Sequence, residues 1–199
     1  MFFEHRDPVH KAMQRLVRRL RRARIPYAIM GAMAVNAHRA ERTTKDVDVL
    51  LTLRGLERFC KEFVNKFYES VSGHPRRFIE RRSGVRVDVL VTGLFPGRGE
   101  PKAFAFPDPI EASEEIKKIR VLTLPQLIQL KLAAGRHYDF GDVVNLIGVH
   151  NLDEAFLVRL HSSVHKDFIE CLEEKRRDDQ YEARQNQAIA ELKKKSRYS

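Results

Sequence analysis

The chain has 199 residues, of which 43% are apolar and 32% are charged, so it can bury a core and is not a disordered tail. No apolar run approaches the ~18 residues of a membrane span, and the N-terminal stretch lacks a hydrophobic leader, which argues against a membrane protein and a secreted protein. The formal net charge of +10 favours a polyanionic partner, because each neutralised phosphate releases counterions.

The two cysteines argue against a disulfide scaffold and against a structural zinc site. Cys60 and Cys171 lie far apart in the sequence, and neither belongs to a CxxC or Cys/His cluster. We therefore expect a reducing, cytoplasmic compartment, with Cys60 as a core residue.

An amphipathic, arginine-rich helix is predicted over residues 8–24. Asp7 and Pro8 are typical of an N-cap and a first helical position, and apolar residues recur at helical spacing after them. Residues 1–25 carry eight basic side chains against two acids, which is +6 of the net +10. The arginine side is either a solvated face or a surface for nucleic acid or an acidic partner.

Two strand–helix units follow this helix. Residues 27–30 are a short apolar run that predicts a buried strand, and Gly31 opens a segment of small residues typical of a helix. A turn of this kind points backbone N–H groups at a place where an anion can bind. Residues 46–52 predict a second strand, and residues 54–67 predict a second helix.

The rest of the chain divides into a hairpin, a loop and a helical half. Residues 78–91 contain two alternating runs around a Ser-Gly pair, which is typical of a hairpin. Residues 93–109 are rich in glycine and proline and predict a loop that either covers a site or only connects. The pattern is helical from Pro125 onward, and the residues from Arg177 predict a frayed helix or a disordered tail.

Three acidic residues on predicted strands are the strongest candidates for chemistry. Side chains two apart on a strand point the same way, so Asp46 and Asp48 share one face. Asp88, beside Arg86 on a later strand, joins them if the two strands are neighbours. Adjacent carboxylates repel one another unless a cation lies between them, and hard carboxylate oxygens suit Mg²⁺ or Mn²⁺. The alternative is an exposed strand face that simply carries acids.

The residues around these acids resemble a known superfamily. Gly31 at a helix start, the D-V-D run of residues 46–48 and Asp88 on a later strand look like the DNA polymerase β-type nucleotidyltransferases. Residues 42–48 read R-T-T-K-D-V-D, and this R-x-T-x-D-x-D form is similar to the AbiEii-like nucleotidyltransferases of type IV toxin–antitoxin systems.

A downstream segment extends the resemblance to about residues 27–147. Residues 131–134 match a K-L-x-A segment of that group, and residues 136–142 match its R-x-K-D-x-x-D motif. Two positions differ from the pattern, because Ala32 stands in the glycine pair and Tyr138 stands where the motif has lysine.

The resemblance implies a role for each acid and for the glycine turn. The backbone around Gly31 and Ala32 would hold the triphosphate of an incoming nucleotide. Asp46 and Asp48 would ligate the metals that bridge the phosphates. Asp88 would complete the second metal site and help to deprotonate the attacking hydroxyl.

The same resemblance assigns the basic residues to the nucleotide. Arg42 and Thr44 would position phosphate or the metal-binding strand. Lys131 would neutralise triphosphate charge from the helical half. Its neighbours there are Arg136, Asp139 and Asp142.

Several of these residues have an ordinary alternative. Arg42 can pair with a surface acid, and Thr44 can serve only to start a strand. Lys131 can extend to solvent from an apolar helix, and either aspartate near it can cap a helix. His38 is expected to be a packed or surface histidine rather than a ligand.

The resulting hypothesis is an α+β nucleotidyltransferase fold, with a small mixed sheet flanked by helices and a helical C-terminal half. Residues 1–120 would form the core with its basic N-terminal helix, and residues 121–199 the helical region. The hypothesis implies Mg²⁺- or Mn²⁺-dependent transfer of a nucleoside monophosphate from a nucleoside triphosphate to a hydroxyl, with RNA, in particular tRNA, as acceptor and an antitoxin as possible protein partner.

Three alternatives stay open. The chain is a non-catalytic module that binds nucleic acid or protein on the same scaffold, a nucleotidyltransferase for a small molecule or protein, or a partner subunit whose arginine helix docks an acidic protein.

Overall fold

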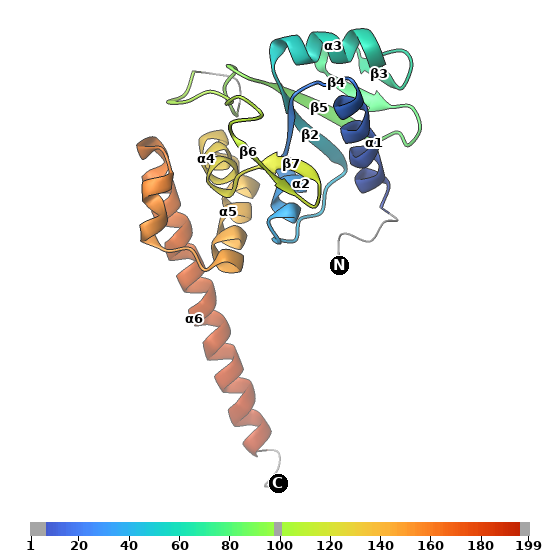
Figure 1. The fold of residues 1–199 in the computed structure, drawn as a ribbon. Helices are drawn as coiled ribbons and strands as arrows, with labels where there is room; N and C mark the ends of the chain where they lie inside the picture. Colours follow the sequence, from blue (N-terminus) through green and yellow to red (C-terminus); the bar gives the residue numbers. More distant parts are fainter. Residues whose placement is uncertain (1–6, 98–100, 196–199) are drawn as a thin grey trace.

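A mixed sheet forms the centre of the molecule (Figure 1). The computed structural model describes residues 7–97 and 101–195, and within them seven strands pair in the order β3-β4-β5-β2-β1-β7-β6. The strands are β1 (Tyr27–Met30), β2 (Asp46–Leu51), β3 (Tyr68–Val71), β4 (His74–Glu80), β5 (Arg86–Val91), β6 (Ser113–Ile116) and β7 (Ile119–Leu122). β2 runs parallel to β5 and antiparallel to β1. The predicted mixed sheet is confirmed.

The helices gather in two groups around this sheet. They are α1 (Pro8–Arg22), α2 (Gly31–Ala37), α3 (Leu53–Phe63), α4 (Leu124–Ala134), α5 (His137–His150) and α6 (His165–Lys195), with 3₁₀ turns at Glu154–Arg159 and Ser162–Val164. α1 and α3 pack on β2, and α3 also on β5, whereas α4, α5 and the start of α6 pack together on the other side (Figure 1). α2 contacts β1, β2 and α4. The predicted α+β class with a helical C-terminal half is confirmed.

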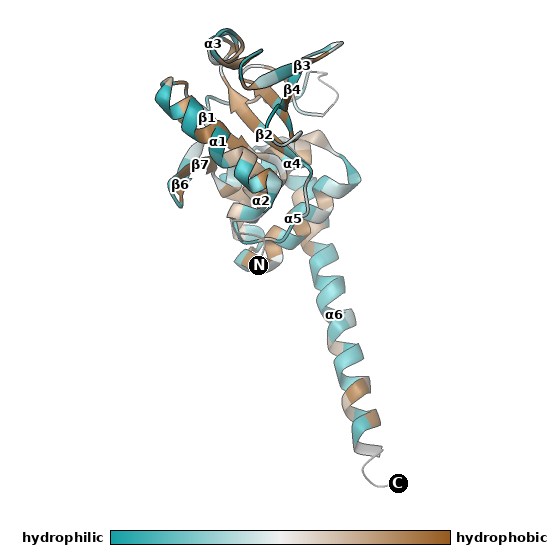
Figure 2. Cartoon of the chain, turned by 90° about the vertical axis from the view of Figure 1, so that its right-hand side faces the viewer, coloured by the Kyte–Doolittle hydropathy of each residue, from teal (hydrophilic) through white to brown (hydrophobic). Residues whose placement is uncertain are grey.

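The core forms on the faces of β2 and β5 that their valines share. Val47 and Val49 of β2 and Val87 and Val89 of β5 are almost completely buried. Because side chains alternate along a strand, this burial leaves the acidic positions of both strands on the opposite face. Figure 2 shows the middle of the sheet around β2 in brown, the colour of hydrophobic residues.

α1 buries one side and divides its arginines between two roles. The side chain of Asp7 accepts a hydrogen bond from the backbone N–H of Val9 at 3.0 Å, and Pro8 occupies the first turn, as predicted. Arg15 and Arg19 are partly buried against Glu80 at the end of β4. The helix ends at Arg22 rather than at residue 24, and two of the charges counted at the N-terminus, Glu4 and Arg6, lie outside the described residues.

The hairpin predicted over residues 78–91 is present but belongs to a larger meander. β4 and β5 pair antiparallel, with Phe78 opposite Val87. β4 begins earlier than predicted, at His74, and pairs on its other side with β3, which the sequence analysis missed. The helix predicted over residues 54–67 ends at Phe63, because the chain must turn there to enter β3.

The β6–β7 hairpin was also missed. Its turn is Lys117-Lys118, and both residues have positive φ, 48° and 64°. Two-residue hairpin turns of this geometry usually carry Asn or Gly, so two lysines gave no turn signal.

α6 leaves the body of the molecule as a single exposed helix (Figures 1 and 2). Its first turns bury Phe168, Cys171 and Leu172. The side chains from Arg176 to Lys193 are exposed, and the helix continues to Lys195. Of the two alternatives for the tail, the structure therefore has the helix. Among the described residues, no helix combines the length and the apolar composition needed to cross a bilayer.

Glu80 is the buried acid that joins α1 to the meander. Its side chain is 1% exposed, accepts hydrogen bonds from Arg15 Nε at 2.7 Å and Ser83 Oγ at 2.6 Å, and lies 3.2 Å from Arg19 Nη1. Burial alone would raise the pKa of Glu80, but the hydrogen bonds from Arg15 and Ser83 outweigh it and hold that pKa below its ordinary value.

We expect the Glu80→Gln substitution to lower the free energy of unfolding at pH 7 by roughly 3 kcal/mol, because it leaves Arg15 without a carboxylate. Since the folded pKa is depressed, the stabilisation is present above the ordinary pKa and is lost as the pH falls through the folded pKa. Urea unfolding at pH 7 and below pH 4 measures both effects. The matched control is Glu69→Gln, which removes an exposed pair with Arg81 and should change stability by less than about 0.5 kcal/mol.

Candidate active site

Two neighbouring strands bring three carboxylates to one face of the sheet. β2 and β5 pair in parallel register, with Asp48 directly opposite Asp88 and Asp46 opposite Arg86. Side chains two apart on a strand share a face, so these four residues form a square on the face opposite the buried valines. The strand adjacency on which the sequence hypothesis depended is therefore present.

Gly31 lies where β1 turns directly into α2, against one corner of this square. Its φ is +61°, a conformation that residues with a Cβ rarely adopt. A Cβ built on Gly31 would lie 1.9 Å from Asp48 Oδ2, so the carboxylate rests directly on the glycine backbone. Ala32, the second residue of the turn, has no positive φ, which explains why alanine is tolerated there.

Asp48 keeps its proton far above the usual range of an aspartate. Burial and the like charges of Asp46 and Asp88 raise the pKa of Asp48 to about 7, while Lys131 and Arg136 oppose the shift. A positive charge close to Asp48 would favour its ionised form, because it would offset the repulsion from the other two acids.

Asp46 and Asp88 are held by neighbouring donors. Thr44 Oγ1 donates to Asp46 Oδ1 at 2.8 Å, and Arg77 Nε donates to Asp88 Oδ1 at 3.0 Å. Arg86 forms ion pairs with both acids, and its Nε lies 3.4 Å from Asp88 Oδ2.

The donor chemistry of this site fits a hard divalent cation. Among the described residues no three His, Cys, Asp or Glu side chains stand together as a ready ligand set. The guanidinium of Arg86, however, already places a positive charge between Asp46 and Asp88. Three carboxylates that need a cation between them, with oxygen as the donor atom, are the chemistry that Mg²⁺ and Mn²⁺ prefer.

A cleft of about 290 Å³ opens beside the carboxylates, and we call it the α4 cleft. Gly31, Asp48 and Asp88 lie on the side of the sheet. The remaining walls include Leu127, Leu130, Lys131 and Ala134 of α4, Phe95, Pro96, Gly97 and Phe106 of the loop, and Arg136. A Cβ on Gly97 would lie 3.1 Å from the carbonyl oxygen of Ala134, so the loop is closed onto α4. Of its two alternatives, the glycine- and proline-rich loop is the one that lines a cleft.

Lys131, Asp139 and Asp142 form a buried charge network between α4 and α5. Lys131 Nζ lies 2.6 Å from Asp142 Oδ2 and 3.2 Å from Asp139 Oδ1, and all three residues are buried. Neither an extended lysine nor a helix cap describes them, since α5 begins after Arg136 without a side-chain cap. The ammonium of Lys131 already has two carboxylate partners, and its contact with a triphosphate stays a prediction.

Two arginines connect this network to its surroundings. Arg42 Nε lies 3.0 Å from Asp142 Oδ1, and Arg136 Nε lies 2.5 Å from Asp139 Oδ2. Arg42 is fixed further by Asn36, which exchanges two hydrogen bonds of 2.7 Å with its backbone. Arg42 therefore pairs with a buried acid rather than with a surface acid, and it ties the segment before β2 to α5.

Tyr138, which stands where the motif has lysine, carries no charge, but two arginines lie over its ring. Its ring is half exposed, and the guanidinium carbons of Arg136 and Arg42 lie 4.6 and 5.6 Å from the ring centroid.

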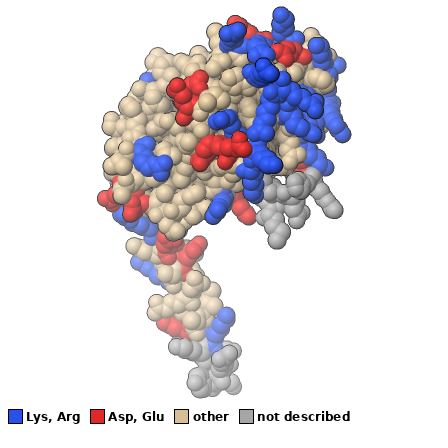
Figure 3. Space-filling view, in the orientation of Figure 1, with Lys and Arg blue, Asp and Glu red and all other residues tan. Residues whose placement is uncertain are grey.

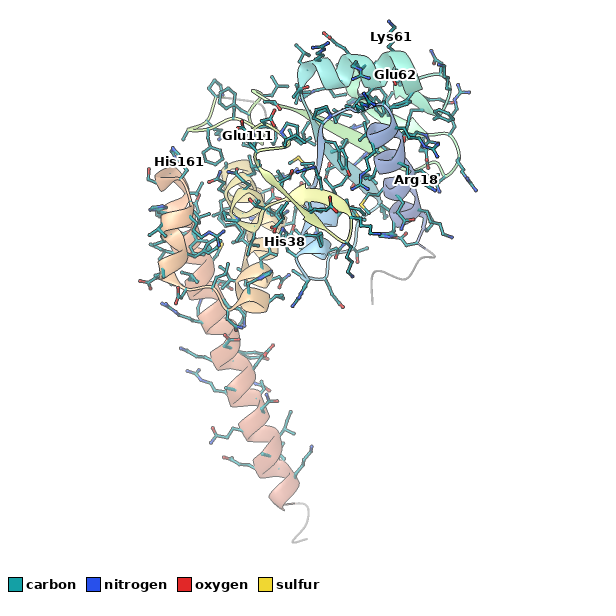
Figure 4. The ribbon with its side chains drawn as sticks, in the orientation of Figure 1. Arg18, His38, Lys61, Glu62, Glu111 and His161 are labelled. Carbon is teal, nitrogen blue, oxygen red and sulfur yellow. The ribbon has the colours of Figure 1, made fainter. Side chains whose placement is uncertain are left out.

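His38, labelled in Figure 4, is a packed residue, as expected. Its side chain is buried, and its Nε2 lies 2.8 Å from the carbonyl oxygen of Leu122. Burial lowers the pKa of His38.

A second hollow, of about 300 Å³, meets the α4 cleft at Asp88, and we call it the β4 hollow. Its lining consists of Gly73, His74, Pro75, Arg76, Arg77, Asp88, Val89 and Leu90. Arg76 and Asp88 line both spaces. Arg76 and Arg77 were not predicted as site residues, because the strand that pairs beside Asp88 was expected to begin at residue 78, after both arginines. The sequence analysis placed Arg86 beside Asp88 by alternation but assigned it no role.

Comparison with solved structures identifies the fold. An antigenic nucleotidyltransferase-like protein from Paracoccidioides brasiliensis superposes with a TM-score of 0.55 at 18% identity, over 87% of this chain and 90% of that chain. A lincosamide antibiotic adenylyltransferase, LnuA, in its lincomycin-bound form superposes with a TM-score of 0.50 at 14% identity, over 70% of this chain and 96% of that chain. No protein-family model and no curated protein matches the sequence. The chain therefore has the nucleotidyltransferase fold that its motifs resemble.

We expect the Gly31→Ala substitution to destabilise the protein more than the matched Gly84→Ala substitution. Both residues have positive φ, but a Cβ on Gly84 meets nothing within 4 Å. Each variant loses about 1 kcal/mol for the unfavourable backbone conformation, and Gly31→Ala should lose roughly 1–2 kcal/mol more because the Asp48 carboxylate must move. Urea unfolding of the three proteins measures the difference. Equal losses would mean that Asp48 does not rest on Gly31.

The raised pKa of Asp48 predicts a pH-dependent stability in the absence of divalent ions. The stabilisation is fully present below the ordinary pKa of 3.8 and is lost as the pH rises through about 7. Between pH 5 and pH 8, the free energy of unfolding of the wild type should therefore fall by at least about 1 kcal/mol relative to Asp48→Asn. Urea unfolding in EDTA tests this, and the exposed Asp179→Asn serves as control. Parallel pH profiles of wild type and Asp48→Asn would contradict the prediction.

Proposed function

We propose that this protein transfers a nucleoside monophosphate from a nucleoside triphosphate to an acceptor hydroxyl, with RNA as the acceptor. The observation that carries the proposal is the register of β2 and β5, which sets Asp46, Asp48 and Asp88 on one face of the sheet, where Asp48 and Asp88 line the α4 cleft. Carboxylates so placed beside a cleft of this size are typical of sites that manage phosphate charge through divalent cations.

Asp46, Asp48 and Asp88 would hold Mg²⁺ or Mn²⁺ in this proposal. The bound cation would supply charge neutralisation for the phosphates and for the attacking and leaving oxygens. The three side chains fit the role because they are hard oxygen donors, and burial together with the charges of Asp46 and Asp88 already raises the pKa of Asp48.

The proposed reaction takes place at the α-phosphorus of the nucleotide. The acceptor oxygen forms a bond to the α-phosphorus, the bond from the α-phosphorus to the bridging oxygen breaks, and pyrophosphate leaves. Asp88 lies where the α4 cleft meets the β4 hollow and would accept the proton of the attacking hydroxyl.

The walls of the α4 cleft suit the two ends of a nucleotide. Arg136 lines the cleft and pairs with Asp139, and its side chain is 55% exposed, so it would also meet a phosphate there. The backbone of Gly31 lies on the sheet side. Phe95 and Phe106 give the loop side an apolar surface for a base. Arg42 and Thr44 would act by positioning the strand that carries Asp46, because Thr44 donates to Asp46 and Arg42 ties the segment before the strand to Asp142 of α5.

Positive charge on two surfaces favours RNA as the acceptor. Arg76 and Arg77 line the β4 hollow beside Asp88, where the acceptor would approach. A larger basic surface, the α1 basic face, consists of the exposed residues Lys11, Arg18, Arg21, Arg22 and Arg24. Figure 3 shows lysine and arginine side chains gathered over this part of the molecule. Phosphates of a polynucleotide would find cations both next to the reacting end and at a distance from it.

A toxin-like role, with an antitoxin as protein partner, is the most specific part of this proposal. It rests on the likeness of residues 42–48 to the AbiEii-like motif. Growth of cells that express the wild type or Asp48→Asn tests it, because only the wild type should arrest growth.

We expect calorimetric titration to show that the wild type binds one of the four nucleoside triphosphates only when Mg²⁺ or Mn²⁺ is present. Incubation with total RNA and that nucleotide, labelled on its α-phosphate, should place label on RNA. Asp48→Asn should reduce incorporation by at least about 100-fold, because it removes a metal-binding carboxylate without changing the shape of the site.

The control for this experiment is Asp179→Asn, an exposed acid of α6, which should behave as the wild type. Label on protein or on a small molecule would retain the transferase and reject RNA as acceptor. Salt-sensitive RNA binding that is unchanged in Asp48→Asn, with no nucleotide binding in any protein, would favour the non-catalytic alternative.

A further inference from the structure

Arg86 occupies the corner of the carboxylate square where a fourth acid would otherwise increase the repulsion. It lies opposite Asp46 in the β2–β5 register and two residues before Asp88 on its own strand. Its side chain therefore projects from the same face as the three acids. No other cation in the described residues forms ion pairs with two of these acids.

The contacts of Arg86 are those of a counter-ion shared by two strands. The guanidinium forms an ion pair with Asp46 Oδ2 on β2 and, through Nε, with Asp88 Oδ2 at 3.4 Å on β5. That Nε is buried but makes no hydrogen bond, so its contact with Asp88 is one of charge rather than of aligned donor and acceptor. The side chain is 42% exposed, which leaves it room to move outward.

A second observation is that further donors of the protein already engage both acids. Asp88 also accepts a hydrogen bond from Arg77 Nε at 3.0 Å, and Asp46 accepts one from Thr44 Oγ1 at 2.8 Å. In this arrangement the described residues contain no ready set of three metal-ligating side chains. A divalent cation between Asp46 and Asp88 would lie next to the Arg86 guanidinium, and the two positive charges would repel each other strongly.

The geometry points to Arg86 as an internal counter-ion that holds Asp46 and Asp88 together in the metal-free protein and must leave them when a divalent cation binds. This inference rests on the proposed function, because it assigns the regulation of the same site. Arg86 is a positioning residue here, since it acts through the two carboxylates. A divalent cation can bind only if the two ion pairs of Arg86 break, which weakens metal binding. The protein without metal is therefore stable, and it binds metal weakly until a nucleotide adds further ligands.

The test is Mn²⁺ binding to the full chain without nucleotide, measured by calorimetric titration, together with thermal unfolding in EDTA. Arg86→Gln should bind Mn²⁺ at least about tenfold more tightly than the wild type and unfold at a lower temperature in EDTA, because its carboxylates lose their counter-ion. The matched control is Arg58→Gln, which removes a guanidinium of similar exposure (41%) from a pair with Glu62 and should leave Mn²⁺ affinity unchanged.

The Arg86→Lys variant keeps the test decisive if the glutamine variant does not fold. Its shorter side chain retains the charge but cannot span both strands, so it should bind Mn²⁺ more tightly than the wild type, whether or not Arg86→Gln folds. Unchanged or weaker Mn²⁺ binding in both variants, with only a loss of stability, would overturn the inference.

The outcome also separates this inference from the proposed function. If the wild type binds Mn²⁺ with nucleotide and labels its acceptor, but the Arg86 variants do not bind Mn²⁺ more tightly, only the role of Arg86 fails. If neither the wild type nor any variant binds Mn²⁺ with or without nucleotide, both the metal-dependent function and the role of Arg86 fail.

Discussion

The mutual repulsion of Asp46, Asp48 and Asp88 is the constraint on which the site depends. The register of β2 and β5 fixes their backbones side by side, so the side chains cannot separate far. Two unit charges about 5 Å apart at an effective dielectric constant near 20 repel by about 3 kcal/mol, which a marginally stable domain cannot leave uncompensated. Arg86 forms ion pairs with two of the acids, and the pKa of the third, Asp48, is raised to about 7 by burial and by the other two charges.

Charge compensation continues away from the sheet and shapes the cleft. Lys131 on α4 is neutralised by Asp139 and Asp142 on α5, and Arg42 joins Asp142 from the segment before β2. Breaking such a buried network is costly, because one partner would remain as an uncompensated charge. The helical half is thereby held at a fixed place beside the strand that carries the acids, and the loop closed onto α4 completes the wall.

Helices and turns that begin with the residues typical of them were predicted correctly from the sequence. Asp7 with Pro8 marked the start of α1, and the Ser-Gly pair at Ser83 marked the β4–β5 turn. The β6–β7 hairpin escaped because Lys117-Lys118 adopts positive φ without the residues that normally signal it. β3 escaped because four residues that pair with β4 carry too little alternation to stand out from the predicted helix before them.

The sequence by itself determined which side chains share a face: alternation set Asp46 with Asp48, and Arg86 with Asp88, because successive residues of a strand point to opposite sides. Only the tertiary structure decided that these two pairs lie on adjacent strands and that Lys131 meets two acids of α5. The order of strands in a sheet and the partners of a buried charge depend on contacts between distant parts of the chain. A local pattern carries no information about such contacts.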